Sequence, residues 1–187
     1  MDLATIHHSS MKDLIRLICT LNNNTLDDYQ NGLISDAVER LMAREDRSFP
    51  VSKLIPLILE PADAETKRHG IKARLKAWKQ GGEYGWVIDN RTDTFDVSNL
   101  DVFGVDGTEF LDDKVVAPVA SFYLIYRVTM LADGRRLIIY MDEFWQWLNN
   151  DAFRDFVYNK LKTGRKLDMV LVVATQSPDE LIKTPIA

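Results

Sequence analysis

Through residues 1–82, apolar side chains recur every three or four positions, which is the spacing of amphipathic helices. The stretch 9–21 predicts a helix that begins at its serines, with an apolar face made of Leu14, Leu17, Ile18 and Leu21. The stretch 25–45 predicts a longer helix, capped by Thr25 and turned inward through Leu33, Ile34, Ala37, Val38, Leu41 and Met42.

Two further helices are predicted before Gly82. One is expected to begin at a cap formed by Ser52. The other covers residues 64–79 and places Ile71, Leu75 and Trp78 on one side. The cations of this stretch are interpreted as a solvated helix face, with a binding site as the alternative.

Beyond Gly82 the pattern changes to short apolar runs that alternate with helical stretches. Residues 84–90 predict a short strand, residues 101–113 a strand followed by a turn, and residues 114–131 a strongly apolar helix with Phe122, Tyr123 and Tyr126 in the core. The runs LIIYM (137–141) and MVLVVA (169–174) predict strands buried on both faces.

A helix predicted over residues 151–166 connects these two strands. Strand, helix and strand with short connections favour a parallel sheet covered by helices, joined by a right-handed crossover. The sequence therefore predicts an α/β fold, with a helical subdomain over residues 1–82 and a sheet domain over residues 83–187.

Composition narrows the class of protein. The 187 residues are 46% hydrophobic and 27% charged, which is typical of a soluble globular chain. A net charge of −5 gives the whole chain no cationic surface for nucleic acid, although a local basic patch is still allowed. The single cysteine, Cys19, excludes an internal disulfide and fits a reducing cytoplasm. No apolar run of 18 residues occurs, so no membrane span is predicted.

Polar residues follow both predicted strands. Asp142 and Glu143 come directly after the first strand, and Gln176 follows the second. Ligands of open parallel sheets gather beyond the carboxyl ends of the strands, so direct pairing would place these residues in one crevice. This combination suits nucleotide hydrolysis: Asp142 would hold Mg²⁺ through water, Glu143 would orient or deprotonate the attacking water, and Gln176 would bind that water or the terminal phosphate.

Each of these residues also has a simpler interpretation. Asp142 can cap a helix over residues 143–150, and Gln176 can satisfy backbone groups in a loop. Arg165 ends the predicted connecting helix, where a cation meets the helix dipole favourably. Trp145 and Trp147 are interpreted as packing residues rather than a stacking platform.

The joined pattern of an apolar strand, MDE, a helix ending in KTGRK, and ATQSP resembles the type IV secretion and conjugal-transfer ATPases, the VirB/TrbE/CagE family. The upstream pieces GGEYGWVIDN, GVDGTEFLDD and APVASFYLIYRV are also similar to that family. The resemblance is strong from Gly81 to Ala187 and weaker, but compatible, across the helical first part.

The resemblance implies a partial RecA-like P-loop NTPase core and hydrolysis of ATP with Mg²⁺ to power pilus assembly or the transfer of DNA or protein. It implies Asp142 and Glu143 as the Walker B pair, Gln176 as the sensor of the γ-phosphate, and Arg165 as an arginine finger. It also implies other secretion components as partners, a hexamer or dimer of the full-length protein, and a cytoplasmic position at the periphery of the bacterial inner membrane.

The sequence departs from that family at one motif. G-x-x-x-x-G-K-[ST], the phosphate-binding loop, is absent from the 187 residues. In the family this loop lies upstream, and the family's chain continues beyond Ala187, so the sequence is expected to be a fragment. Because the strand over 169–174 would then lose its neighbour, we expect the isolated chain to bind nucleotide weakly or not at all and to self-associate.

Two alternative functions stay open. The first is a DNA-pumping translocase or coupling protein of the same superfamily, which the GWVIDN and TEFLDD segments and the acidic charge disfavour. The second is a non-catalytic interaction module of the secretion machine, supported by the missing phosphate loop. The substitution Glu143→Gln distinguishes the module from an ATPase, because it would abolish function only in the enzyme.

Overall fold

The computed structural model describes residues 3–46, 48, 50–92, 95, 99–131, 136–143, 158 and 168–174. The chain divides into two compact units, Met1–Phe103 and Gly104–Ala187. The predicted domain boundary after residue 82 stays a prediction, but residues 83–103 are part of the first unit. The predicted combination of helices with a small parallel sheet is confirmed.

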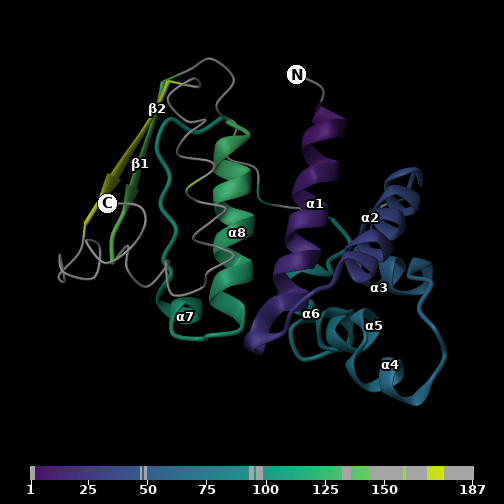
Figure 1. The fold of residues 1–187 in the computed structure, drawn as a ribbon. Coiled ribbons are helices and arrows are strands. Elements are labelled where there is room, and N and C mark those ends of the chain that lie inside the picture. Colours follow the sequence, from purple (N-terminus) through teal and green to yellow (C-terminus); the bar gives the residue numbers. More distant parts are fainter. Residues whose placement is uncertain are drawn as a thin grey trace. The chain divides into compact units, whose positions relative to one another are not determined.

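The first unit is helical in its described part (Figure 1). Its longer helices are α1 (Leu3–Thr20) and α2 (Asp28–Met42), which pack against each other. The shorter elements are η1 (Leu21–Asn23), α3 (Pro50–Leu54), η2 (Ile55–Leu57), α4 (Ala64–His69), α5 (Ile71–Leu75), η3 (Lys76–Trp78) and α6 (Gly85–Ile88).

The core of this unit follows the predicted helical spacing closely. In α2 the buried side chains are Ile34, Ala37, Val38, Leu41 and Met42, while the predicted Leu33 is only half-buried. In α1 the buried face is rotated slightly, because Ile15 and Cys19 are fully buried whereas Leu14 is half-buried. The predicted side made of Ile71, Leu75 and Trp78 is buried.

Several predicted helix starts are wrong. Helix α1 begins at Leu3, upstream of the serines, in a stretch without proline or glycine to interrupt it. Helix α2 is capped by Asp27 instead of Thr25: the Asp27 Oδ1 accepts the Gln30 N–H at 2.7 Å, and the Gln30 Oε1 accepts the Asp27 N–H at 3.2 Å. This reciprocal capping box satisfies two backbone donors where a lone threonine would satisfy one.

The helix predicted over residues 64–79 is broken at Gly70, whose backbone is extended. Here the Glu60 carboxylate accepts the backbone N–H groups of Ile71 and Lys72 and so starts a new helix. A Cβ atom at position 70 would lie 2.5 Å from the Thr66 carbonyl oxygen and 2.7 Å from the Glu60 Oε1, and the backbone contact in particular requires glycine.

The predicted strand over residues 84–90 is also wrong, because Gly85–Ile88 forms the helical turn α6. The turn brings Asp89, only 2% exposed, against the start of α3 and the end of η3. Its carboxylate accepts the N–H groups of Val51 (2.8 Å), Ser52 (3.2 Å) and Gln80 (2.6 Å) and the Ser52 hydroxyl hydrogen. Helix α3 therefore begins at Pro50 under a distant cap, and Ser52 lies inside it rather than capping it.

We predict that Asp89→Ala destabilises the chain by about 3 kcal/mol, because three buried or half-buried N–H groups lose their acceptor. Urea unfolding followed by circular dichroism measures the change. Asp63→Ala is the matched control, since Asp63 caps α4 only from within its own exposed turn. An equal or smaller loss for Asp89→Ala than for Asp63→Ala would contradict the role assigned to Asp89.

In the second unit, helix α7 (Thr108–Leu111) is followed by α8 (Val116–Thr129). Helix α8 confirms the predicted apolar helix, with Phe122 and Tyr126 buried and Tyr123 half-buried. The strand predicted within residues 101–113 does not form: the backbone from 102 to 107 is irregular, and the Asp106 Oδ1 accepts the Thr108 N–H at 2.9 Å to start α7.

Strands β1 (Leu137–Met141) and β2 (Met169–Val173) pair in parallel, from Leu137 opposite Met169 to Met141 opposite Val173. Their direct pairing confirms the predicted parallel arrangement. The predicted burial on both faces is not observed. Residues paired across the two strands point to the same face of the sheet, and one face is exposed. The exposed fractions of its side chains are 51% for Ile138, 75% for Tyr140, 48% for Val170 and 39% for Val172. Two further helices were predicted, over residues 143–150 and 151–166. Of these residues the structure describes only Glu143 and Tyr158.

We predict that this apolar sheet face makes the chain self-associate, because exposed apolar strands without a neighbour are association hazards. The double substitution Tyr140→Lys and Val172→Lys should weaken association by ~10-fold or more, since association would bury two charges. Light scattering over a range of protein concentrations measures it. A chain that stays monomeric at every concentration without any substitution would refute the prediction.

Candidate functional site

The candidate site lies at the carboxyl end of the strand pair. The Ala174 N–H donates to the Met141 carbonyl at 2.9 Å, so the ladder continues to the last residue of β1. Asp142 and Glu143 follow immediately and form a turn. The two strands therefore end side by side, as predicted, with the acids of one beside Ala174 of the other.

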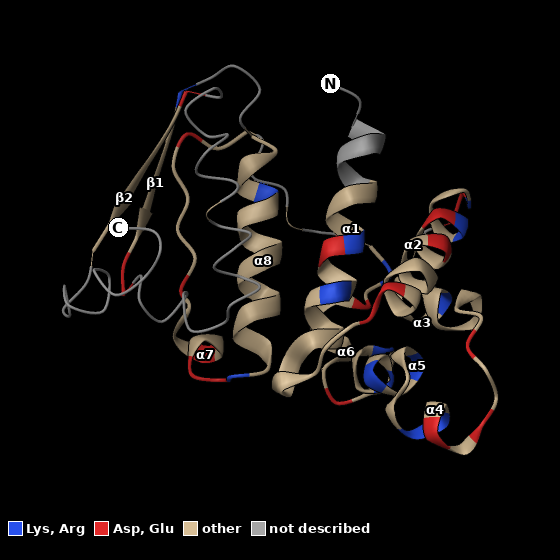
Figure 2. Cartoon of the chain, in the orientation of Figure 1, with Lys and Arg blue, Asp and Glu red and all other residues tan. Residues whose placement is uncertain are grey.

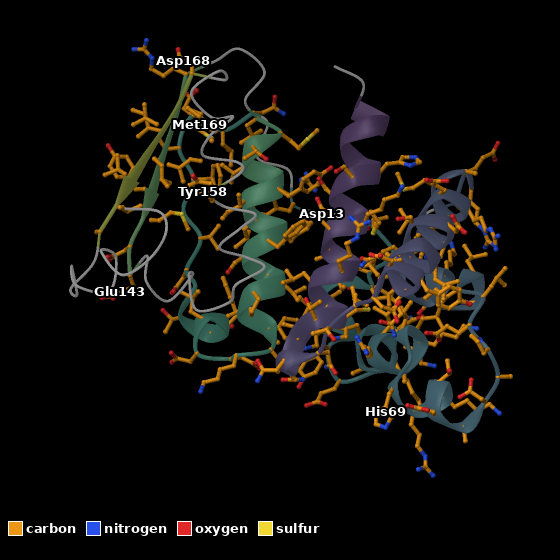
Figure 3. All side chains as sticks on the ribbon, viewed as in Figure 1. Asp13, His69, Glu143, Tyr158, Asp168 and Met169 are labelled. Atoms are coloured by element: carbon orange, nitrogen blue, oxygen red, sulfur yellow. The ribbon has the colours of Figure 1, made fainter. Side chains whose placement is uncertain are left out.

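Charges mark both ends of this sheet while its length is apolar (Figure 2). At the amino end, the Arg136 Nε lies 3.3 Å from the Asp168 Oδ2 in an exposed ion pair, which is expected to add little stability. Glu143 and Asp168 appear at opposite ends of the strands (Figure 3). The carboxylates of Asp142 and Glu143 are thus separated from that ion pair by the whole length of β1.

The turn after β1 has an unusual backbone. Glu143 adopts a left-handed conformation with φ of 47°, and its N–H donates to the Asp142 Oδ1 at 2.9 Å. Non-glycine residues occupy this region at an energetic cost, and such residues are frequent at functional sites. At this turn Asp142 is exposed and Glu143 is half-buried. The left-handed conformation of Glu143 could not be predicted from the spacing of hydrophobic residues, and the dipeptide Asp–Glu indicates a turn only weakly.

Two predicted site residues, Gln176 and Arg165, lie outside the described residues, as do Trp145 and Trp147. The alternative of Asp142 as a helix cap involves residues 144–150, which also lie outside them. The structure therefore places the carboxyl end of β1, followed by Asp142 and Glu143, next to the carboxyl end of β2, followed by Ala174. Gln176 comes two residues after Ala174 in the sequence.

Two buried polar groups of the first unit, Cys19 and Asp89, lie outside this site. Burial raises the pKa of the Cys19 thiol to about 12, so at neutral pH this cysteine is protonated and is a poor nucleophile. The buried Asp89 was not predicted, because its contacts join residues far apart in sequence; its hydrogen bonds go to backbone N–H groups and to Ser52, as expected for a structural carboxylate.

No group of three or more His, Cys, Asp or Glu side chains in the described part of the chain is arranged to hold a metal ion by itself. Mg²⁺ in nucleotide sites is commonly held by one or two carboxylates together with water and the phosphates. The exposed carboxylate of Asp142 directly beyond β1 fits that mode. Among the helices that the structure describes, none has the length and apolar character needed to cross a membrane.

Comparison with known proteins relates the chain to a family of P-loop domains. The model of the TraG P-loop domain matches residues 61–187. The type IV secretion system protein virB4 of Bartonella quintana is 40% identical over 177 residues, covering 95% of this chain and 22% of that protein. The type IV secretion system protein CagE of Helicobacter pylori is 33% identical over 196 residues, covering 96% of this chain and 19% of that protein.

A third relative, the type IV secretion system protein PtlC of Bordetella pertussis, is 29% identical over 183 residues, covering 95% of this chain and 22% of that protein. The chain thus spans about a fifth of the length of these relatives. The match extends over nearly all of the chain, including the helical first unit.

The left-handed turn after β1 leads to a prediction about stability. Glu143→Gly should leave the chain about 1 kcal/mol more stable than Glu143→Ala, because both remove the carboxylate but only glycine adopts a φ of 47° without strain. Urea unfolding of the two variants measures the difference. Equal stability of the alanine and glycine variants would show that the turn relaxes when the side chain is removed.

Proposed function

This chain belongs to the TraG P-loop domain family of type IV secretion ATPases, and from that premise we propose that it forms part of the ATPase domain of a type IV secretion or conjugation motor. The observation that carries the proposal is the parallel pairing of β1 with β2, which sets Asp142 and Glu143 beyond the carboxyl end of a two-strand ladder. Open parallel sheets bind their ligands at this end. The resemblance read from the sequence agrees with the family that the comparisons identify.

In this proposal β1 and β2 are the Walker B and sensor strands of a RecA-like core over residues 83–187, and residues 1–82 form a helical subdomain. The support for a shared site is the position of Gln176 along the chain. Gln176 is two residues from Ala174 along the chain, a separation that a polypeptide spans with at most about 7 Å. This short separation from Ala174, whose N–H pairs with the last residue of β1, is what supports a shared role for Gln176 with Asp142 and Glu143.

Each residue has a separate task in ATP hydrolysis. Glu143, the less exposed acid, orients the attacking water and accepts its proton as the water attacks the γ-phosphate and the bond to the departing ADP breaks. Gln176 donates a hydrogen bond to the γ-phosphate or the water. Arg165 acts as an arginine finger that stabilises the charge developing on the transferred phosphoryl group. The left-handed turn at Glu143 comes directly after β1, so both acids follow the last residue of the strand.

In this scheme Asp142 would be the residue that holds Mg²⁺, and the nucleotide would supply the phosphate ligands. When bound, Mg²⁺ neutralises charge on the phosphate oxygens. The Asp142 Oδ1 already accepts the Glu143 N–H, which orients the carboxylate at the end of β1. ATP would be cradled by a G-x-x-x-x-G-K-[ST] loop, which these 187 residues do not contain, so the complete site requires a further segment.

The wider role is likewise a proposal. The names of the relatives support work within a type IV secretion system, which implies other components of that system as partners. We propose a hexamer or dimer of the full-length protein, with DNA or protein as the transferred substrate and a cytoplasmic position at the periphery of the inner membrane. A DNA-pumping coupling protein is the alternative, and it shares the same strand-end acids. A non-catalytic module is the second alternative, supported by the absent phosphate loop.

We predict that Mg²⁺-dependent binding of a fluorescent ATP analogue and ATP hydrolysis appear when this chain is mixed with a separately produced segment that carries the phosphate loop. Glu143→Gln should lower hydrolysis by ~100-fold or more while leaving binding intact, because the water loses its base. Asp142→Asn should weaken the Mg²⁺-dependent part of binding. Phosphate release and fluorescence titration measure the two quantities.

Glu109→Gln provides the matched control, since Glu109 is exposed, lies in the same unit and loses the same charge. This variant should hydrolyse ATP at the unmodified rate. If the mixture forms a stable complex but hydrolyses nothing, or if Glu143→Gln and Glu109→Gln behave alike, the strand-end acids do not perform this chemistry and the interaction module becomes the better explanation.

A further inference from the structure

Helix α2 contains an exposed glycine that the packing of this chain does not require. Gly32 lies inside the helix, and a Cβ atom at this position would meet nothing within 4 Å. Its φ is not positive, so no left-handed conformation calls for glycine here. Glycine inside a helix is destabilising relative to alanine. A second surface that comes close to the α2 backbone from outside would explain the missing side chain.

Acidic side chains flank this glycine on the same side of the helix. Asp28 and Asp36 lie four residues before and after Gly32, so the three positions form one stripe along α2, and all three are exposed. Within the part of the chain that the structure describes, neither carboxylate takes part in an ion pair. The stripe ends one turn later, where Glu39 is paired with a lysine of α1 and Arg40 reverses the charge.

A row of lysines lies on another part of the same unit. Lys72, Lys76 and Lys79 each follow a buried residue of α5 or η3, so they lie along one line beside the inner side of this segment. Lys76 and Lys79 are exposed and Lys72 is half-buried. Among the described residues, none of the three lysines forms an ion pair. Figure 2 shows acidic residues on α2 and basic ones on α4 and α5.

The two stripes match in length as well as in charge. Asp28 and Asp36 are eight positions apart, which is about 12 Å along an α-helix. Lys72 and Lys79 are seven positions apart, which is also about 12 Å, because η3 has the larger rise of a 3-10 helix. Carboxylates at both ends of one stripe can therefore meet lysines at both ends of the other.

An exposed aromatic ring accompanies each stripe. Tyr29, next to Asp28, is 60% exposed, and Trp86 on α6 is 67% exposed. Helix α6 packs against η3, and a Cβ atom at Gly85 would lie 2.2 Å from the Lys79 carbonyl oxygen, so Trp86 lies close to the lysines in the fold. Tyrosine and tryptophan are enriched in protein interfaces, which favours a protein as the occupant of both stripes.

We propose that the acidic stripe of one copy, formed by Asp28, Gly32 and Asp36, binds the lysine stripe of a second copy, formed by Lys72, Lys76 and Lys79. Gly32 lets the partner helix approach the α2 backbone, and the carboxylates on either side of it meet the lysines. The two stripes are different surfaces, so the contact is heterologous and repeats from copy to copy as a ring or a filament. The inference rests on the homo-oligomer proposed above and names the surfaces that would form it.

A second copy explains more than another partner does. Both stripes belong to the compact unit Met1–Phe103, in whose described part no ion pair joins them. An unrelated acidic protein would account for the lysines but not for Gly32, Asp28 and Asp36. An unrelated basic protein would leave the lysines unexplained. One contact between two copies accounts for both stripes and for the glycine.

The test is sedimentation velocity of the full chain over a range of protein and salt concentrations, without nucleotide. Every chain carries Tyr140→Thr and Val172→Thr, which make the exposed sheet face polar without adding charge. Asp28→Lys with Asp36→Lys, and separately Lys76→Glu with Lys79→Glu, should each weaken association ~10-fold or more, because attraction becomes repulsion. An equimolar mixture of these two variants should associate as the unmodified chain does, because every stripe then faces its opposite charge.

A steric variant tests the role of the glycine separately. Gly32→Gln should weaken association ~10-fold because the added side chain blocks the approach, yet it should raise the urea midpoint, since glutamine is the better helix former. Ala43→Gln is the matched control, because Ala43 is also exposed and ends the same helix. This control should associate as the unmodified chain does, and added salt should weaken the association of both.

The proposal is overturned if the chain without charge reversals stays monomeric, if either reversal leaves association unchanged, or if the mixture does not restore it. It is also overturned if Gly32→Gln associates as well as Ala43→Gln. Restoration in the mixture shows that both reversed chains are folded, so a loss in either one alone is not a folding defect. Because no nucleotide is present, the result does not depend on ATP hydrolysis by the strand-end acids, and either proposal can fail without the other.

Discussion

The parallel hydrogen-bonded pairing of β1 with β2 is the interaction on which the candidate site depends. It runs in register from Leu137 opposite Met169 to Met141 opposite Val173, and the Ala174 N–H extends it to the end of β1. Because parallel strands point the same way, whatever follows each strand emerges at one edge of the sheet. An antiparallel pairing of the same two runs would place the acids of one strand beside the start of the other. The chemistry proposed for Asp142 and Glu143 rests on this geometric constraint.

The helical unit is organised by a different interaction, carboxylates that accept the free N–H groups at helix starts. Asp27 and Asp63 do this for α2 and α4 from the adjacent residue, whereas Glu60 and Asp89 do it for α5 and α3 from distant positions. Asp89 also holds the turn that carries Trp86, because its N–H bonds to Gly85 while its side chain bonds to Gln80. The buried carboxylate thereby joins three segments of the first unit, while the acids after β1 belong to the other unit.

The predictions that are confirmed depend on short-range spacing. The inward face of α2 follows from a period of 3.6 residues, and the apolar helix α8 and the strands LIIYM and MVLVV follow from continuous apolar runs. A short window of the sequence contains either signal. The errors arise where distant residues decide the backbone. Residues 84–90 have strand-like composition, yet they turn because Asp89 bonds to residues 51, 52 and 80 and Gly85 packs on Lys79. The break at Gly70 depends in the same way on Glu60, ten residues upstream.

By itself the sequence determined the α/β class, the inward faces of the main helices, the two strands and the polar residues that follow them, because these depend on side-chain chemistry and local periodicity. The resemblance to type IV secretion ATPases also came from the sequence, and the TraG P-loop match to residues 61–187 agrees with it. Only the tertiary structure decided that the two strands pair directly, that Glu143 adopts a left-handed turn and that one sheet face is exposed. Strand pairing and the exposure of a sheet face depend on residues far apart in the chain, whose interactions no local pattern encodes.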